Sequence, residues 1–200
     1  MANITTPFGL KPVRHLTGAP YNGQIIECYC AAGYATALYV GDPVLFSPTL
    51  TEKDATAKRP TINLSAGTTG VLIRGVIVGF APDPDDLTKT YRPASTERIA
   101  YVVPALDDLV FHVRDDGSGT PAAVFPGQNA ELANAGGNTA TGLSGFALDA
   151  STPTTTQAHN VHILGLADIE NNELGDYAIW EVLINTNNNT TGRFLGITAS

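Results

Sequence analysis

The chain has 200 residues, of which 43% are hydrophobic and 15% charged, and a formal net charge of -8. A chain of this length can remove about 70% of its unfolded surface from water, which suits one domain with a real core rather than two. Its 11 Lys and Arg residues are scattered through an acidic sequence, which argues against binding to nucleic-acid phosphates, and no apolar run reaches the roughly 18 residues of a membrane span.

Residues 1–23 predict an extended N-terminal arm. Six proline and glycine residues interrupt this stretch, too many for a helix or an interior strand. The arm contains Lys11, Arg14 and His15 but no carboxylate, because the first acidic residue is Glu27. It also lacks the apolar core of a signal peptide, so we expect the protein to be made and folded in a cytoplasm.

Residues 24–200 predict a single antiparallel β-sandwich domain. Short runs with alternating apolar and polar residues, rich in β-branched side chains, are separated by turn residues, and 20 Gly and 13 Pro residues fit this pattern. Only residues 128–135 have a helical pattern, and residues 48–69 predict a long loop with one short strand at most. The expected strands are 24–32, 36–40, 43–47, 70–80, 98–104, 109–114, 161–167 and 178–184. Seven or eight such strands favour a sandwich or a barrel.

The two cysteines, Cys28 and Cys30, are expected to be buried thiols. At positions i and i+2 of a strand they face the same way, without the geometry of an easy disulfide. The alternative, half of a metal site, lacks a second pair of ligands at suitable spacing. Trp180 lies on the apolar face of its strand and is expected in the core.

Catalytic and ion-binding motifs are weak throughout the chain. Gly142–Gly145 resembles a nucleophile elbow without the strand and helix that the motif requires. His112 is interpreted as a surface imidazole, and His159 and His162 are expected on opposite faces of a strand. The aspartates of two loops could bind calcium, but we interpret them as solvated turn residues: Asp83, Asp85, Asp86, Asp115 and Asp116. The sequence therefore predicts neither an enzyme nor a cofactor.

Several stretches resemble a group of tailed-phage virion proteins. The opening MANITTPFGLKPVRHLTGAPYNG and the following YATALYVGDPV are similar to the start of these proteins, and LGLADIENNELGDYAIWEVLIN is similar to a segment near their end. Residues 48–160 align loosely, through 107–111 and 142–145, and the Asn-rich tail NTNNNTTGRF departs from the group. The resemblance implies a head decoration, or cement, protein, for which a jelly-roll-like sandwich would be typical.

This resemblance implies a protein on the outer surface of a phage capsid, bound to the major capsid protein. We expect a homo-oligomer, a trimer before a dimer, because such proteins sit on symmetry axes. Complementary charge favours docking of the arm onto a coat or sister subunit. The candidate coat- or subunit-binding residues are Phe8, Leu10, Lys11, Pro12, Arg14 and His15. The alternative is a receptor- or glycan-binding module displayed on the virion, and a third possibility is a hydrolase of the cell envelope.

Overall fold

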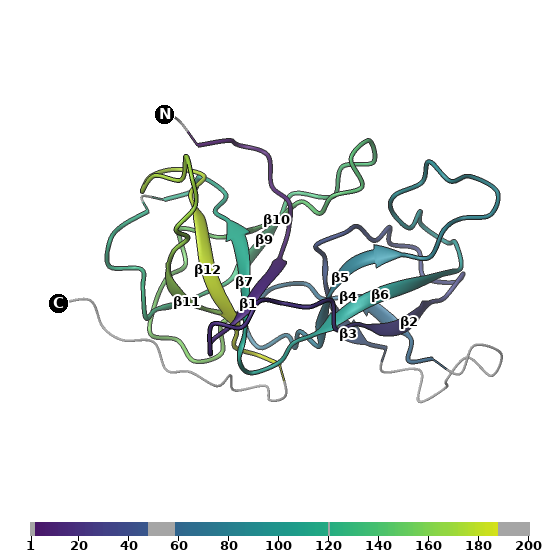
Figure 1. The fold of residues 1–200 in the computed structure, drawn as a ribbon, viewed down its shortest axis with the longest axis horizontal. Helices are drawn as coiled ribbons and strands as arrows, with labels where there is room; N and C mark the ends of the chain where they lie inside the picture. The colour runs from purple at the N-terminus through teal and green to yellow at the C-terminus, as the bar shows by residue number, and fades with distance from the viewer. Residues whose placement is uncertain (1–2, 48–58, 120, 188–200) are drawn as a thin grey trace.

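The computed structural model describes residues 3–47, 59–119 and 121–187, and in these residues the protein is all-β with antiparallel sheets. Two five-stranded sheets lie side by side along the long axis of the molecule (Figure 1). This confirms the predicted all-β, antiparallel class. The predicted jelly-roll-like arrangement and the extended N-terminal arm at residues 1–23 are not confirmed.

Sheet A has the strand order β1-β7-β12-β11-β8. Its strands are β1 (Lys11–His15), β7 (Leu109–Arg114), β12 (Ile179–Ile184), β11 (Val161–Leu166) and β8 (Asn129–Ala130). β8 leads directly into β9 (Leu132–Asn134), which pairs with β10 (Phe146–Leu148). A bridge between Asp115 and Leu148 then joins β10 to the end of β7. The strands β7, β12, β11, β8, β9 and β10 therefore follow one another around a closed circuit.

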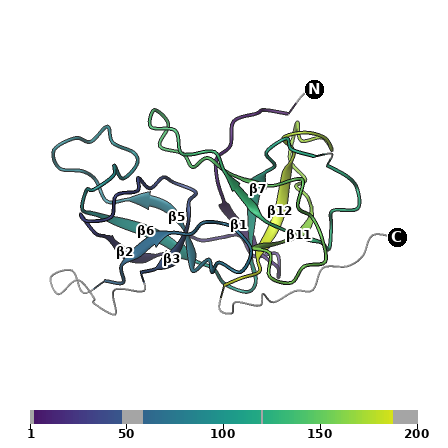
Figure 2. The ribbon, with the colours of Figure 1, turned by 180° about the vertical axis from the view of Figure 1, so that it is seen from behind.

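Sheet B has the strand order β2-β6-β5-β3-β4. Its strands are β2 (Ile26–Cys30), β6 (Arg98–Pro104), β5 (Gly75–Phe80), β3 (Pro43–Phe46) and β4 (Ile62–Leu64). The N–H of Tyr29 donates to the carbonyl of Pro60 at 2.9 Å, which connects β2 to the start of β4 and closes this sheet as well. All five strands come from residues 26–104, whereas sheet A combines β1 with the second half of the chain (Figure 2).

The protein has two hydrophobic cores, and strands β5 and β6 contribute side chains to both of them. Successive residues of a strand point to opposite sides. Accordingly, Val76 and Val103 pack into the larger core beneath sheet A, while Ile77 and Val102 pack into the smaller core of sheet B. This two-sided burial accounts for the apolar character of Gly75–Ile77, the buried half of β5 within the apolar run at residues 70–80.

Three residues that the sequence predicts to be buried, Cys28, Cys30 and Trp180, are buried in the structure. Trp180 is 1% exposed in the larger core, between strands of sheet A. Cys28 and Cys30 are free, fully buried thiols in the smaller core. Burial raises the pKa of Cys28 to about 12 and that of Cys30 to about 11. The prediction of inert, buried cysteines is thus confirmed.

The predicted helix at residues 128–135 is wrong. This segment forms β8 and β9, which pair with β11 and β10 respectively. A helix of barely two turns has little stability of its own, so strand pairing with two neighbours prevails over the local pattern. Residues 36–40 form only isolated bridges, and the run at 70–80 becomes a strand only from Gly75. Residues 48–58 of the expected loop lie outside the described residues.

Candidate functional site: an apolar groove between the sheets

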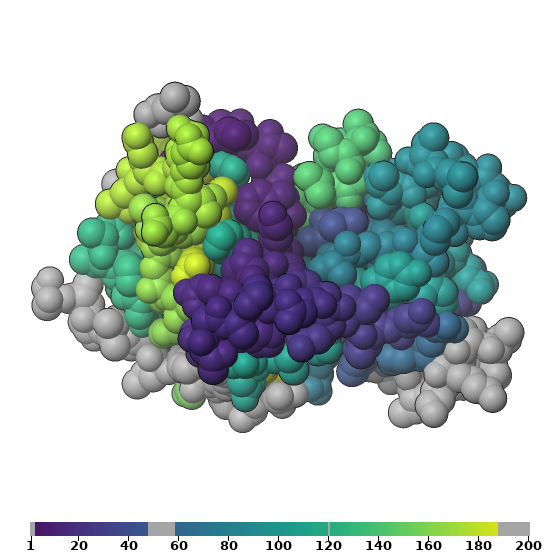
Figure 3. Space-filling view, in the orientation of Figure 1, coloured from purple at the N-terminus to yellow at the C-terminus, as the bar shows by residue number. Residues whose placement is uncertain are grey.

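The opening segment, residues 3–15, lies on the body of the protein along its whole length. The side-chain amide of Asn3 donates to the carbonyls of Glu173 and Asp176. Arg114, which is 7% exposed, donates to the carbonyl of Ile4 and lies over the ring of Phe8, 5.6 Å from its centroid. The segment ends in β1, the edge strand of sheet A. The described residues of the opening segment are therefore held against their own chain (Figure 3).

Two glycines explain how the opening segment approaches sheet B so closely. Gly9 and Gly41 both have positive φ angles, 74° and 96°. A Cβ atom at Gly41 would overlap the carbonyl of Phe8, and one at Gly9 would overlap Gly41 and Ser144. The contact is completed by the N–H of Leu10, which donates to the carbonyl of Gly41 at 2.9 Å. Only glycine permits both the backbone conformation and the approach.

This contact brings together three motifs that are far apart in the sequence. The stretches at 7–10, 40–44 and 142–145 all carry the resemblance described above. Val40 donates its N–H to the carbonyl of Gly142, and Ser144 donates to the carbonyl of Val40. The buried Ser144, 1% exposed, accepts a hydrogen bond from the N–H of Phe146. Its place in a packed junction excludes Ser144 from acting as an exposed nucleophile in this conformation.

The three basic residues of the opening segment have different surroundings. Arg14 forms an ion pair with Glu181 of β12 at 2.6 Å, and His15 contacts Asp108 at 2.9 Å. The opening segment contains basic residues and no carboxylate, and two of these basic residues, Arg14 and His15, lie beside carboxylates from later parts of the same chain. Lys11 is exposed and, among the described residues, has no ion pair or side-chain hydrogen bond.

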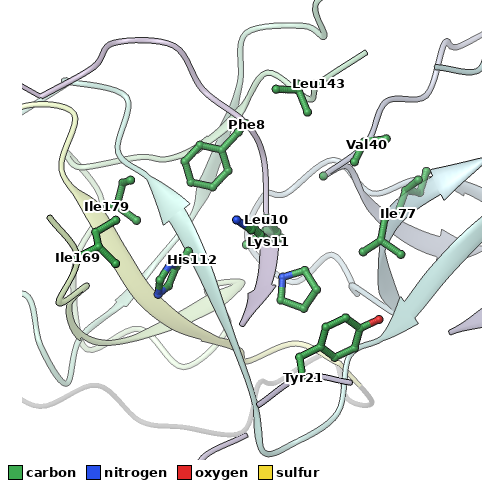
Figure 4. A pocket seen from close by; sticks show the side chains of 13 residues that line it. Phe8, Leu10, Lys11, Tyr21, Val40, Ile77, His112, Leu143, Ile169 and Ile179 are labelled. Carbon is green, nitrogen blue, oxygen red and sulfur yellow. The ribbon is translucent and has the colours of Figure 1, made fainter. Parts of the chain in front are cut away.

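An apolar groove of about 650 Å³ lies where the opening segment passes between the sheets. We call the lining residues of the opening segment its floor; they are Phe8, Leu10, Lys11 and Pro12, four of the six residues that the sequence singled out. Figure 4 labels the first three of them. Arg14 and His15 follow on the same strand outside the lining. The walls come from both sheets and their loops, with Val40 and Ile77 on one side and His112, Ile169 and Ile179 on the other.

The lining of the groove contains one lysine and one histidine, and no Arg, Asp or Glu. Lys11 lies opposite His112 in the strand register, and His112 in turn lies opposite Glu181. Burial is the largest effect on His112 and lowers its pKa; the hydrogen bond and charge of Glu181 oppose this lowering, and the charges of Lys11 and Arg14 add to it. Burial alone would raise the pKa of Glu181, but the hydrogen bond and charge of Arg14 lower it. Lys11 is the only Lys, Arg, Asp or Glu residue among the described residues that line the groove.

The candidate binding residues predicted from the sequence include the four that form the floor of the groove, but none of the residues that form its walls. Ile77, Ile169 and Ile179 are ordinary apolar residues of separate segments, and nothing in their spacing shows that they face one another. The half-buried His112 lies in the groove wall beside Glu181, at 3.5 Å, and not on the open surface as the sequence suggested. The exposed fraction of Ile169, 41%, is the property that marks it as a contact residue, and this fraction is visible only in the structure.

Other candidates have mainly structural roles. Asp115, interpreted from the sequence as a solvated turn residue, is 1% exposed and accepts hydrogen bonds from the Trp180 indole and from the N–H groups of Gly117 and Tyr177. Tyr39 stacks on Tyr91, with ring centroids 5.1 Å apart. Within the described residues, no group of three or more His, Cys, Asp or Glu side chains is arranged to hold a metal ion.

The fold and the groove define an all-β protein with an apolar groove between its two five-stranded sheets. No protein-family model, curated protein or solved structure matches the chain. A search of the described residues finds no helix with the length and hydrophobicity to cross a membrane.

Proposed function

We propose that this protein is a decoration, or cement, protein that binds the outer surface of a tailed-phage head and connects neighbouring major capsid subunits. In this role it is a non-enzymatic protein that binds polypeptide through the groove between its sheets. The observation that carries the proposal is the groove itself, because residues from the motifs that resemble virion proteins form its floor. Concave, mostly apolar surfaces with a few polar groups are a common form of binding site.

The physical basis of the function is multivalent binding to an assembled shell. A ligand that binds only the assembled state stabilises that state by mass action. Each groove contact is small, but an oligomer that engages several subunits at once gains effective concentration, so modest contacts add up to tight binding. Stabilisation of this type would resist the outward pressure of packaged DNA.

The test is binding of the purified protein to mature heads that lack it. Deletion of residues 2–18 is a poor variant, because it removes Leu10 from the core and β1 from sheet A. Ile169→Gln instead changes one exposed wall residue, 41% exposed, and Leu106→Gln is its control at 40% exposure outside the groove lining. Occupancy should fall for Ile169→Gln and not for Leu106→Gln. Failure of the unaltered protein to bind heads would refute the function.

The second candidate is a glycan- or receptor-binding module on the virion. It is favoured by the half-buried, stacked rings of Tyr39 and Tyr91, since Tyr39 lines a separate pocket of about 270 Å³ together with Asp42 and Asn134. Aromatic rings and polar groups of this kind suit sugar binding. Copy number separates the two functions, because a cement protein approaches the coat protein in abundance and an adhesin on the tail is rare. A gel of purified particles measures it.

A further inference from the structure

The groove requires an occupant with apolar side chains and a carboxylate. Its lining is apolar apart from Tyr21, His112 and Lys11, and the exposed Lys11 has no ionic partner among the described residues. Arg14 and His15 are already paired with carboxylates, so they add little to the attraction. A segment that buries an aliphatic side chain in the groove and places an acidic group beside Lys11 would satisfy both features.

The loop at residues 81–97 of this same chain has that chemistry. Leu87 is 78% exposed, the largest exposed fraction among the large hydrophobic residues described. Asp85, two positions earlier, is exposed and has no ion pair in the described part of the chain. The loop projects from the end of sheet B that lies away from sheet A (Figures 1 and 2), so it cannot fold back onto its own groove without leaving sheet B.

The loop is also braced into a fixed shape. Lys89 lies 3.7 Å from Asp83 and 3.8 Å from Asp86, and the Asp86 carboxylate accepts hydrogen bonds from the N–H and hydroxyl of Thr88. These local contacts hold Leu87 outward in the free protein. A contact residue that is already ordered loses less conformational entropy on binding.

We propose that the groove of one copy receives the 81–97 loop of a second copy, with Leu87 between the walls and Asp85 beside Lys11. The inference rests on the proposed function in treating the groove as the polypeptide-binding site, and it names a second copy of this chain as the partner. The groove and the loop are different surfaces, so the contact is head-to-tail. Contacts of this type generate closed rings when the rotation between copies closes, as the expected trimer requires.

The experiment is sedimentation velocity of the full chain over a wide range of concentrations, with charge reversal at both positions. Lys11→Glu and Asp85→Lys should each weaken self-association about tenfold or more, and the double variant should recover it, because the two charges are exchanged. Leu87→Ser should weaken association by about tenfold through loss of apolar burial. Leu106→Ser, at 40% exposure, is the control and should leave association unchanged. Thermal unfolding confirms that each variant is folded.

Each outcome decides the matter. Self-association that both single reversals weaken and the double variant restores supports the proposal. A protein that is monomeric at every concentration overturns it, as does association that Leu87→Ser leaves intact or that the double variant fails to restore. If the protein is monomeric but Lys11→Glu still reduces binding to heads, the occupant of the groove is the coat, and the decoration function stands without this contact.

Discussion

Asp42 should make the stability of this protein depend on pH. Its side chain is 3% exposed, beside the junction where the opening segment meets sheet B. One carboxylate oxygen accepts the N–H of Tyr39 at 2.8 Å, and Ser144 provides a side-chain hydrogen bond. Burial is the dominant effect and raises the pKa of Asp42 from 3.8 to about 6 in spite of these hydrogen bonds.

The sign and size of the effect follow from linkage between folding and protonation. The folded carboxyl group binds its proton more tightly than the unfolded one, so the stability it contributes is complete below pH 3.8 and is lost as the pH rises through about 6. A pKa difference of this size corresponds to about 3 kcal/mol in total. Between pH 4 and pH 7 the free energy of unfolding should therefore fall by about 2 to 3 kcal/mol because of Asp42.

The assay compares urea unfolding of the unaltered protein and Asp42→Asn at several pH values. The chain has one tryptophan, Trp180, and its burial makes its fluorescence a reporter of unfolding. The difference between the two proteins isolates Asp42 from other titrating groups, and this difference should decline from pH 4 to pH 7. Ser144→Ala removes a donor that favours the charged form, so the decline should extend to higher pH.

A difference curve that stays flat across this range would refute the reasoning, since it would mean that Asp42 is not buried as described. A curve that rises with pH would have the same consequence, because it would require a lowered pKa. If Ser144→Ala moved the decline to lower pH, the hydrogen bond between Ser144 and Asp42 would not exist in solution.

Three further predictions concern the packing. Arg92 is fully buried and donates hydrogen bonds to four backbone carbonyls. Arg92→Met should therefore lower the free energy of unfolding, measured by urea denaturation, by about 3 kcal/mol. A loss below about 1 kcal/mol would contradict this role. Gly41→Ala should lower the free energy of unfolding clearly more than the control Gly18→Ala does. Both glycines have positive φ, but of the two only Gly41 lacks space for a Cβ atom. Equal losses of stability would show that the close contact at Gly41 does not exist. Cys28 and Cys30 should resist a thiol reagent in the native protein and react in denaturant.

Composition and local pattern predict the class of fold. Alternating β-branched runs, frequent turn residues and a lack of long helical patterns are enough for an all-β protein. They also place Cys28, Cys30 and Trp180 in the interior, because a side chain's face on a strand follows directly from its parity in the sequence. The charge of the opening segment also singled out candidate coat- or subunit-binding residues, four of which line the groove, but the sequence did not predict the groove.

What the sequence by itself determined is therefore the all-β class, the approximate positions of β2, β3, β5, β6, β7, β11 and β12, and the burial of Cys28, Cys30 and Trp180. These properties depend on near neighbours in the chain. Only the tertiary structure decided that β1 joins the sheet built by the second half of the chain, that residues 128–135 pair as strands, and that Arg14 meets Glu181. Each of these depends on contacts between residues far apart in the sequence. The groove is the clearest case, because its floor and walls come from distant segments that acquire a common surface only when both sheets have formed.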